Sequence, residues 1–280
     1  MHIAQIIDTL YVGGAEQLLL TYTKKSVARD IHPTIISLSA CEDSPLPEQL
    51  IQAGAKVVEF PGRNLFDPFR FIRLLQFLRH QRFDVLHAHL EYAVILGIVA
   101  GLITGTPVVV TLHSIRMQYW GKLANILIRL GAQQVIAVGP SVAKTYQATL
   151  HGRHISVEVN PVALIPSLAE TECTALRREI AIDPARPILF SAGRVTAAKG
   201  FGYLLAALDI LRRTHPQVFL AIAGWGWSLD ELTAQVQSLN LQNHVRFLGL
   251  RDDVPRLMVA SDIYVSSSLW EGMPVSILEA

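Results

Sequence analysis

The sequence predicts an α/β fold made of two doubly wound domains in tandem, each built around a parallel sheet. Short apolar runs alternate with longer helical patterns along the chain, which is typical of repeated βαβ units with helices on both faces of a sheet. The alternation stops once, in NPVALIPSLAE (residues 160–170), and then resumes. With 280 residues the chain is long enough for two domains that each bury a core.

The first domain is predicted to span residues 1–166, with a strand at each short apolar run bounded by polar or turn residues. These runs are HIAQII (2–7), PTIISL (33–38), AKVVEF (55–60), DVLHAH (84–89), PVVVTL (107–112), QQVIAV (133–138) and ISVEV (155–159). Helical patterns lie between them. The most apolar one, YAVILGIVAGLI (92–103), is too short to cross a membrane, which takes about 20 residues. We therefore expect a buried helix there.

The second domain is predicted to span residues 167–280 and to repeat the pattern. Its strands are PILFSAG (187–193), VFLAIAG (218–224), HVRFLG (244–249) and DIYVSS (262–267), and its helices are expected at 199–213, at 228–238 and from Val254. In both domains ligands should bind where the strands end, because the carboxyl ends of parallel strands form the binding edge of a doubly wound sheet.

The composition is that of a packed globular protein without a nucleic-acid partner. Only 17% of the residues are charged and the net charge is +1, which argues against a protein that coats a polyanion. The two cysteines, Cys41 and Cys173, are far apart, so no disulfide framework is expected. MHIAQIIDTL lacks the cationic flank and apolar core of a secretory signal, and we predict a cytoplasmic protein.

Two glycine-rich loops follow predicted strands. Gly13 and Gly14 precede a helix that starts near Ala15, so this loop either brings backbone N–H groups close to a ligand or is a plain tight turn. GWGWSL (224–229) has a leucine where a dinucleotide fingerprint needs its third glycine. A nicotinamide cofactor is therefore not predicted.

Three histidines lie at strand ends. His87 and His89 point to the same side of one strand and could bind a metal, but no cysteine or carboxylate stands at ligand spacing. We therefore predict no metal site. His113 directly follows a buried strand, where it could contact a ligand or be a structural histidine that hydrogen bonds to neighbouring backbone.

Two cations follow the first strand of the second domain. SAGRVTAAKGF places Gly193, Arg194 and Lys199 at the strand end. Arginine can bind phosphate through two hydrogen bonds and lysine adds a compact charge, so this loop suits a diphosphate. A solvated loop with incidental charges is the alternative.

Two glutamates, Glu271 and Glu279, lie in the final stretch LWEGMPVSILEA. A helix that starts between Gly272 and Pro274 would place them up to about 12 Å apart. That is longer than the separation of a glycosidase acid and base, and it matches the span from a hexose across a diphosphate to a ribose. One carboxylate could therefore accept hydrogen bonds from sugar hydroxyls and the other from a ribose.

These motifs together resemble family 4 of the retaining glycosyltransferases, which have the GT-B fold of two Rossmann-like domains facing a cleft. The resemblance rests on GGAE near the start, the histidine of TLHS, SAGRVTAAKG, the GxG after VFLAIAG, and FLGLRDDVPRLMVASDIYVSSSLWEGMPVSILEA. It covers almost the whole chain. Its most specific part is the family's pair of glutamates separated by seven residues, which falls on Glu271 and Glu279. Since family members usually continue further, it also implies a chain truncated at the C-terminus with an incomplete second domain.

The resemblance implies a role for each motif. The first domain would lie on the acceptor side and the second would bind the nucleotide sugar. Glu271 would bind sugar hydroxyls and Glu279 a ribose, while the two cations would neutralise the leaving diphosphate. The catalytic residues implied are His113, Arg194, Lys199 and Glu271, and the donor-binding residues are Gly13, Gly14, Gly193, Gly272, Met273, Pro274 and Glu279.

The reaction implied is metal-independent and retaining, with no cofactor besides the nucleotide-sugar substrate. A UDP-sugar is favoured over a GDP-sugar as donor. The acceptor would be a saccharide or a lipid-linked saccharide, in the synthesis of a cell-surface polysaccharide or glycolipid. Two alternatives stay open: a non-catalytic nucleotide-binding or interaction module, and a sugar-nucleotide epimerase built on the same two domains.

One segment suggests contact with a membrane surface. DPFRFIRLLQFLRHQRF (67–83) is predicted to be a helix with Arg70, Arg73, Arg79 and Arg82 around an apolar stripe. It could rest on anionic lipid at the inner face of the membrane, or it could pack on the sheet with a solvated basic face.

Overall fold

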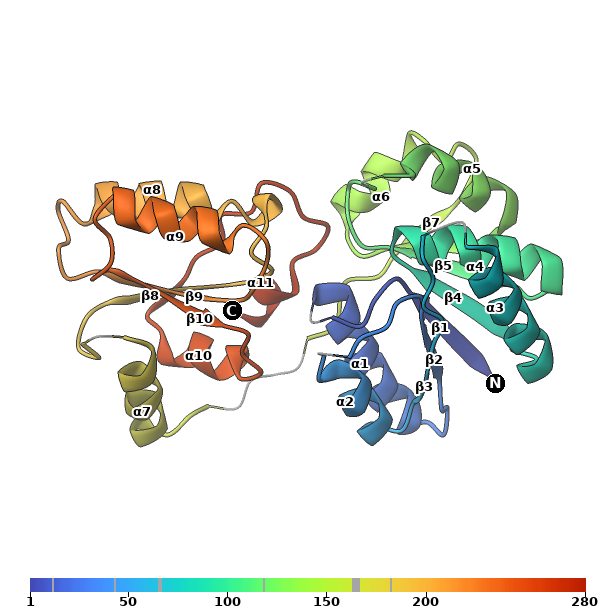
Figure 1. Ribbon diagram of the computed structural model, residues 1–280, viewed down its shortest axis with the longest axis horizontal. Helices are drawn as coiled ribbons and strands as arrows, with labels where there is room; N and C mark the ends of the chain where they lie inside the picture. The colour runs from blue at the N-terminus through green and yellow to red at the C-terminus, as the bar shows by residue number, and fades with distance from the viewer. Residues whose placement is uncertain (12, 43, 65–66, 118, 163–166, 182) are drawn as a thin grey trace. The chain divides into compact units, whose positions relative to one another are not determined.

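The computed structural model describes residues 1–11, 13–42, 44–64, 67–117, 119–162, 167–181 and 183–280. The chain divides into two compact units, Met1–Pro161 and Val162–Ala280, each with its own parallel sheet (Figure 1). The predicted α/β class with two parallel sheets is confirmed. The roles predicted for the two domains remain predictions.

Unit 1 is built on a parallel sheet that contains seven strands within the described residues. The strands are β1 (Ile3–Ile7), β2 (Thr34–Ser37), β3 (Lys56–Glu59), β4 (Val85–His89), β5 (Val108–Leu112), β6 (Ala132–Ala137) and β7 (Ile155–Val157). Their order is β3-β2-β1-β4-β5-β6-β7. The winding reverses between β1 and β4, which makes the carboxyl ends of these two strands the switch point where doubly wound sheets bind ligands.

Helices connect the strands of unit 1 and cover its sheet. They are α1 (Gly14–Val27), α2 (Leu46–Gln52), α3 (Pro68–Gln81), α4 (Glu91–Thr104), α5 (Gly121–Gly131) and α6 (Pro140–Gln147). α4 is the apolar segment expected to be buried, and most of its residues from Ala93 to Gly101 are indeed buried. None of the helices in the described residues is long and apolar enough to span a membrane.

The surface of α3 differs from the sequence-based prediction. Asp67 caps the helix by accepting hydrogen bonds from the backbone N–H groups of Phe69 and Arg70. Arg70 is buried rather than part of a basic face, because its guanidinium donates to the carbonyl groups of Leu38 and Asn64. The predicted set of four exposed arginines is therefore wrong at Arg70, and membrane contact by this helix stays a prediction.

Unit 2 has a smaller parallel sheet, ordered β10-β9-β8-β11 in the described residues. Its strands are β8 (Ile188–Ala192), β9 (Phe219–Ala223), β10 (Val245–Gly249) and β11 (Ile263–Tyr264). Its helices are α7 (Glu170–Ile180), the 3₁₀ turn η1 (Ala197–Lys199), α8 (Phe201–Leu211), α9 (Leu229–Ser238), α10 (Val254–Ala260) and α11 (Val275–Glu279).

Strand β9 shows why this sheet needs helices on both faces. Phe219 and Ala221 point into the core shared with α7 and α10, whereas Leu220 and Ile222 point into the core shared with α8 and α9. All four side chains are apolar and buried, because alternate residues of a strand face opposite sides of the sheet. The two helical layers are visible above and below the sheet in Figure 1.

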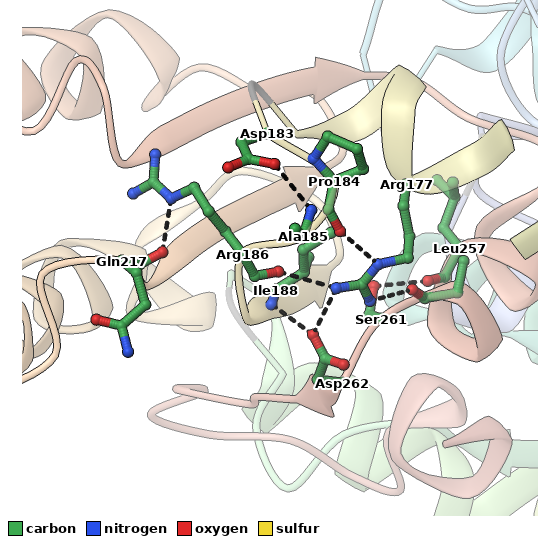
Figure 2. Close-up of polar contacts among 11 residues, drawn as sticks. Arg177, Asp183, Pro184, Ala185, Arg186, Ile188, Gln217, Leu257, Ser261 and Asp262 are labelled. Carbon is green, nitrogen blue, oxygen red and sulfur yellow. Dashed lines mark hydrogen bonds and ion pairs between the residues drawn. The ribbon is translucent and has the colours of Figure 1, made fainter. Parts of the chain in front are cut away.

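A polar network joins the amino ends of β8 and β11 (Figure 2). The guanidinium of Arg177 donates to the carbonyl groups of Pro184 and Arg186 and to Asp262 Oδ2, at 2.8 to 3.1 Å. The same Asp262 oxygen accepts the N–H of Ile188 at 2.7 Å. This network fixes the starts of both strands, so that their carboxyl ends, where the candidate site lies, are held in register.

Candidate functional site

The loop after β8 is held against the loop after β9. Gly193 N donates to Ala223 O and Val195 N donates to Trp225 O, both at 3.0 Å. Gly224 has a φ of +142°, and a Cβ on it would overlap the carbonyl oxygen of Gly193. The two loops therefore approach as closely as they do because glycine stands at this position.

Lys199 and Glu271 form an ion pair at the carboxyl ends of the strands. Lys199 Nζ lies 2.6 Å from Glu271 Oε1, and the lysine stem lies over Gly193, where a Cβ would overlap it. Ser268 Oγ donates to the same carboxylate oxygen at 2.8 Å. Among the described residues both donors contact Oε1, so Oε2 is left to accept hydrogen bonds from a ligand. The structure thus brings together three residues that the sequence placed in one site.

Backbone contacts lock this pair in position. Ser267 Oγ donates to Lys199 O at 2.8 Å, and Leu269 N donates to Ala198 O at 2.8 Å. The segment before Glu271 is therefore tied to the turn that carries Lys199. Arg194 lies at the start of this turn, directly after Gly193, and is exposed.

The helix predicted to begin between Gly272 and Pro274 starts one residue later, at Val275. Pro274 has an extended backbone conformation and precedes the helix, and Glu271, Gly272 and Met273 lie in the loop before it. Helical rise therefore does not set the distance between the glutamates, because the contacts with Lys199 and Ser268 hold Glu271 outside the helix.

Tyr264 lies near both glutamates. Its phenol lies 3.4 Å from the carbonyl of Ala192. Burial, with smaller effects from the charges of Glu271 and Glu279, raises the pKa of Tyr264. Burial also raises the pKa of Glu279. Tyr264 and the two carboxylates therefore belong to the same end of unit 2.

In unit 1, polar groups gather at the carboxyl ends of β1, β4 and β5. Gly13 precedes α1 with extended backbone and Gly14 is the first residue of that helix. Asp8 caps α4, since its carboxylate accepts the backbone N–H groups of Ala93 at 2.6 Å and Tyr92 at 3.2 Å. A cavity of about 240 Å³ opens here, and Asp8 and His113 are among the residues that line it.

The three strand-end histidines form one cluster. His87 and His89 have ring centroids 4.2 Å apart, and His89 Nδ1 lies 2.9 Å from His113 Nε2. His87 Nε2 lies 2.7 Å from Thr111 Oγ1, and His89 Nε2 lies 2.5 Å from Gln5 Oε1. His113 is therefore held by another imidazole rather than by backbone. Within the described residues no group of three metal-binding side chains is placed to hold an ion.

Burial makes these histidines poor bases. It lowers the pKa of His87 to about 4 and that of His113 to about 3, and it lowers the pKa of His89 well below its usual value of 6.5. Burial acts on Asp8 in the opposite sense and raises its pKa to about 7. At neutral pH the three rings are neutral, and they can exchange hydrogen bonds without charge.

Acid should destabilise unit 1 between pH 6.5 and about 4. The unfolded histidines bind protons in this range and the folded ones do not, so each ring lowers stability by up to about 1.4 kcal/mol per pH unit as the pH falls. Asp8 opposes them, because its folded form binds a proton below about pH 7, but three histidines outweigh one carboxylate. Hydrogen exchange of the β1, β4 and β5 amides checks this. In Asp8→Asn the decline should be steeper, and stability that rises on acidification would contradict the account.

Sequence reasoning missed four polar residues around these sites: Gln5, Asp8, Tyr264 and Ser268. Gln5 could have been found as the polar member of an apolar strand, and Asp8 as a carboxylate directly after that strand. Tyr264 and Ser268 carry no comparable signal, because their importance depends on which loops the fold brings together.

Solved structures with a similar fold support the architecture. HepE of Anabaena in complex with UDP-glucose matches with a TM-score of 0.83 at 23% identity, over 96% of this chain and 74% of that one. A mutant of TarM from S. aureus, in complex with fondaparinux, alpha-GlcNAc-glycerol and UDP, matches with a TM-score of 0.77 at 11% identity, over 100% and 83%. The two doubly wound units and these matches define the fold class, which is GT-B.

The sequence comparisons give the family. The family model "Glycosyltransferase Family 4" matches residues 12–164, which is more than half of the chain, and "Glycosyl transferases group 1" matches residues 173–280. The chain therefore belongs to glycosyltransferase family 4, as the motifs had indicated.

Curated relatives are similar over most of the chain. The E. coli UDP-Gal:alpha-D-GlcNAc-diphosphoundecaprenol alpha-1,3-galactosyltransferase is 27% identical over 88% of this chain and 68% of its own length. The phosphatidyl-myo-inositol mannosyltransferase of Mycolicibacterium smegmatis is 27% identical over 96% and 70%. The putative glycosyltransferase EpsF of Bacillus subtilis is 23% identical over 99% and 76%.

Proposed function

We propose that this protein is a retaining glycosyltransferase that moves a sugar from a UDP-sugar to a saccharide or lipid-linked acceptor. The synthesis of a cell-surface polysaccharide or glycolipid is the proposed context. The observation that carries the proposal is the Lys199–Glu271 pair, set among glycine loops at the carboxyl ends of a doubly wound sheet, where such sheets bind nucleotides.

The two cations and the two glutamates bind different parts of the nucleotide-sugar donor. Lys199 and Arg194 balance the charge of the diphosphate, and Oε2 of Glu271 accepts hydrogen bonds from hydroxyls of the transferred sugar. Glu279 accepts from the ribose. Its raised pKa fits a carboxylate in a partly dry site that gains two hydroxyl donors when a nucleotide binds.

Backbone groups and unit 1 complete the proposed assignment. Gly193 and the loop Gly272, Met273 and Pro274 approach the diphosphate and the sugar through main-chain atoms. In unit 1, His113 contacts a hydroxyl of the transferred sugar, and the loop of Gly13 and Gly14 contributes backbone N–H groups to the donor.

We propose substitution on one face of the sugar without a protein nucleophile, because Glu271 and Glu279 are assigned to the hydroxyls of the sugar and the ribose. The bond between the anomeric carbon and the leaving phosphate oxygen breaks, and a bond to the acceptor oxygen forms on the same face. The proton of the acceptor hydroxyl passes to the leaving phosphate. Lys199 and Arg194 stabilise the negative charge that develops on that phosphate.

UDP is the favoured nucleotide because the similar proteins point to it. The E. coli relative is named for a UDP-Gal donor, and HepE has been crystallised with UDP-glucose. The acceptor of the E. coli relative is named as alpha-D-GlcNAc-diphosphoundecaprenol, which favours a lipid-linked saccharide as the acceptor for this chain also.

Calorimetric titration with UDP, GDP and ADP tests the proposal. We expect UDP to bind best and Glu279→Ala to weaken it at least tenfold, which is about 1.4 kcal/mol. Glu231→Ala, which removes an exposed carboxylate in the first turn of α9, should leave affinity unchanged and serves as the matched control.

Other outcomes separate the alternatives. Preference for GDP or ADP would overturn the UDP assignment, and no binding of any nucleotide would overturn the donor site. Binding without sugar transfer to any acceptor would indicate a non-catalytic module. Release of free sugar that does not depend on an acceptor would indicate chemistry of the epimerase kind.

A further inference from the structure

Gln5 is a polar side chain in the middle of β1, an interior strand of the unit 1 sheet. It is fully buried, and its neighbours in β1 are buried and apolar. Its amide nitrogen Nε2 has no hydrogen-bond partner among the described residues. A buried amide group left unpaired costs about 1 to 3 kcal/mol. We therefore ask what the carbonyl oxygen of the same amide, Gln5 Oε1, contributes.

Gln5 Oε1 begins a chain of hydrogen bonds across three neighbouring strands. Gln5 Oε1 lies 2.5 Å from His89 Nε2, and His89 Nδ1 lies 2.9 Å from His113 Nε2. Gln5 belongs to β1, His89 is the last residue of β4, and His113 directly follows β5. The chain therefore leads from the middle of the sheet to the edge where ligands are expected.

Counting protons fixes the direction of each bond. A carbonyl oxygen can only accept, so His89 donates from Nε2. A neutral imidazole has one N–H, which leaves His89 Nδ1 as an acceptor, so His113 donates from Nε2. The remaining nitrogen, His113 Nδ1, then has a lone pair and no proton. Both rings are neutral, because burial lowers the pKa of His89 and of His113 well below neutrality.

We propose that Gln5 is a positioning residue that acts through His89 and holds His113 as a hydrogen-bond acceptor toward the ligand. This inference rests on the proposed function for the identity of the ligand. Among the described residues only His89 hydrogen bonds to the His113 ring, and His113 lines the cavity of about 240 Å³. The ligand group that donates to His113 Nδ1 is a hydroxyl, such as one on a sugar. A phosphate or carbonyl oxygen has no proton to donate, and its lone pairs would repel the lone pair of Nδ1.

The opposite orientation of the Gln5 amide would place the proton on the other nitrogen of His113. If the amide of Gln5 presented its NH₂ group to His89, every bond in the chain would reverse. His113 would then carry its proton on Nδ1 and would donate to a phosphate or carbonyl oxygen. The orientation of one buried amide thus determines which chemical group the site selects.

Long-range ¹H–¹⁵N NMR of the uniformly labelled full chain at pH 7.5 reads the protonated nitrogen of each histidine directly. We expect His89 and His113 both to carry the proton on Nε2. In Gln5→Met, which has a similar shape but replaces the carbonyl with a weakly accepting thioether, both rings should become mixtures of tautomers. Gln134→Leu, which removes an exposed glutamine from β6, is the control and should leave both rings unchanged.

Two results would overturn the inference: a proton on His113 Nδ1 in the wild-type protein, or unchanged tautomers in a folded Gln5→Met. The wild-type spectrum decides the first without any variant. The readout needs no donor, so the inference and the proposed function can fail separately. If the tautomers are as expected but the protein binds no nucleotide, the role of Gln5 stands and the donor-site assignment fails.

Discussion

The Lys199→Met variant should transfer sugar about a hundredfold more slowly than the wild-type protein. Loss of one preorganised group that stabilises developing charge typically costs about 3 kcal/mol. In this protein the loss has a second effect, because Lys199 also neutralises Glu271 at 2.6 Å. With the diphosphate placed as proposed, removal of the lysine would leave an uncompensated carboxylate beside it.

Initial rates with the preferred UDP-sugar at saturating acceptor check this expectation. Arg213→Met is the matched control, because it removes one positive charge from an exposed side chain just after α8. That variant should keep the wild-type rate. Equal rates for Lys199→Met and wild type would show that the lysine does not act on the leaving group.

The second large effect concerns stability. Gly200→Ala should lower the free energy of unfolding of unit 2 by about 3 kcal/mol. Gly200 has a φ of +62°, and a Cβ there would overlap the carbonyl oxygen of Ser267. Since Ser267 also holds the turn that carries Lys199, nucleotide binding should weaken together with stability.

Gly249→Ala separates packing from backbone conformation. Gly249 has nearly the same φ, +68°, but a Cβ on it would have nothing within 4 Å. In this variant the free energy of unfolding should fall by only about 1 kcal/mol, which is the cost of the left-handed backbone conformation for alanine. Hydrogen exchange of the β8 and β9 amides measures both changes. Equal losses in the two variants would mean that contact with Ser267 does not constrain the loop.

The sequence was sufficient to locate the strands, for an identifiable physical reason. Most strands coincide with a short apolar run between turn residues, and a strand such as β9 is apolar throughout because both of its faces are buried. The same pattern could not show that Arg70 turns inward. That orientation depends on the carbonyl groups of Asn64, six residues before it, and of Leu38, which is 32 residues away in the sequence.

For the candidate site also, some residues could be predicted from the sequence but their contacts could not. Lys199 and Glu271 could be named because they occupy strand-end loops, where function concentrates. Their pairing could not be predicted, since residues 72 positions apart meet only when β8 and β11 lie side by side. The hydrogen-bond chain from Gln5 to His113 is similar: its directly bonded residues are up to 84 positions apart in sequence, and only the order of β1, β4 and β5 brings them together.

Calorimetric comparison of UDP with UMP tests the central claim most directly. If the diphosphate binds beside the Lys199–Glu271 pair, UDP should bind at least tenfold more tightly than UMP, which is about 1.4 kcal/mol. The difference should shrink in Lys199→Met. Equal affinity for UDP and UMP in the wild-type protein, or an undiminished difference in the variant, would contradict the placement of the diphosphate at this pair.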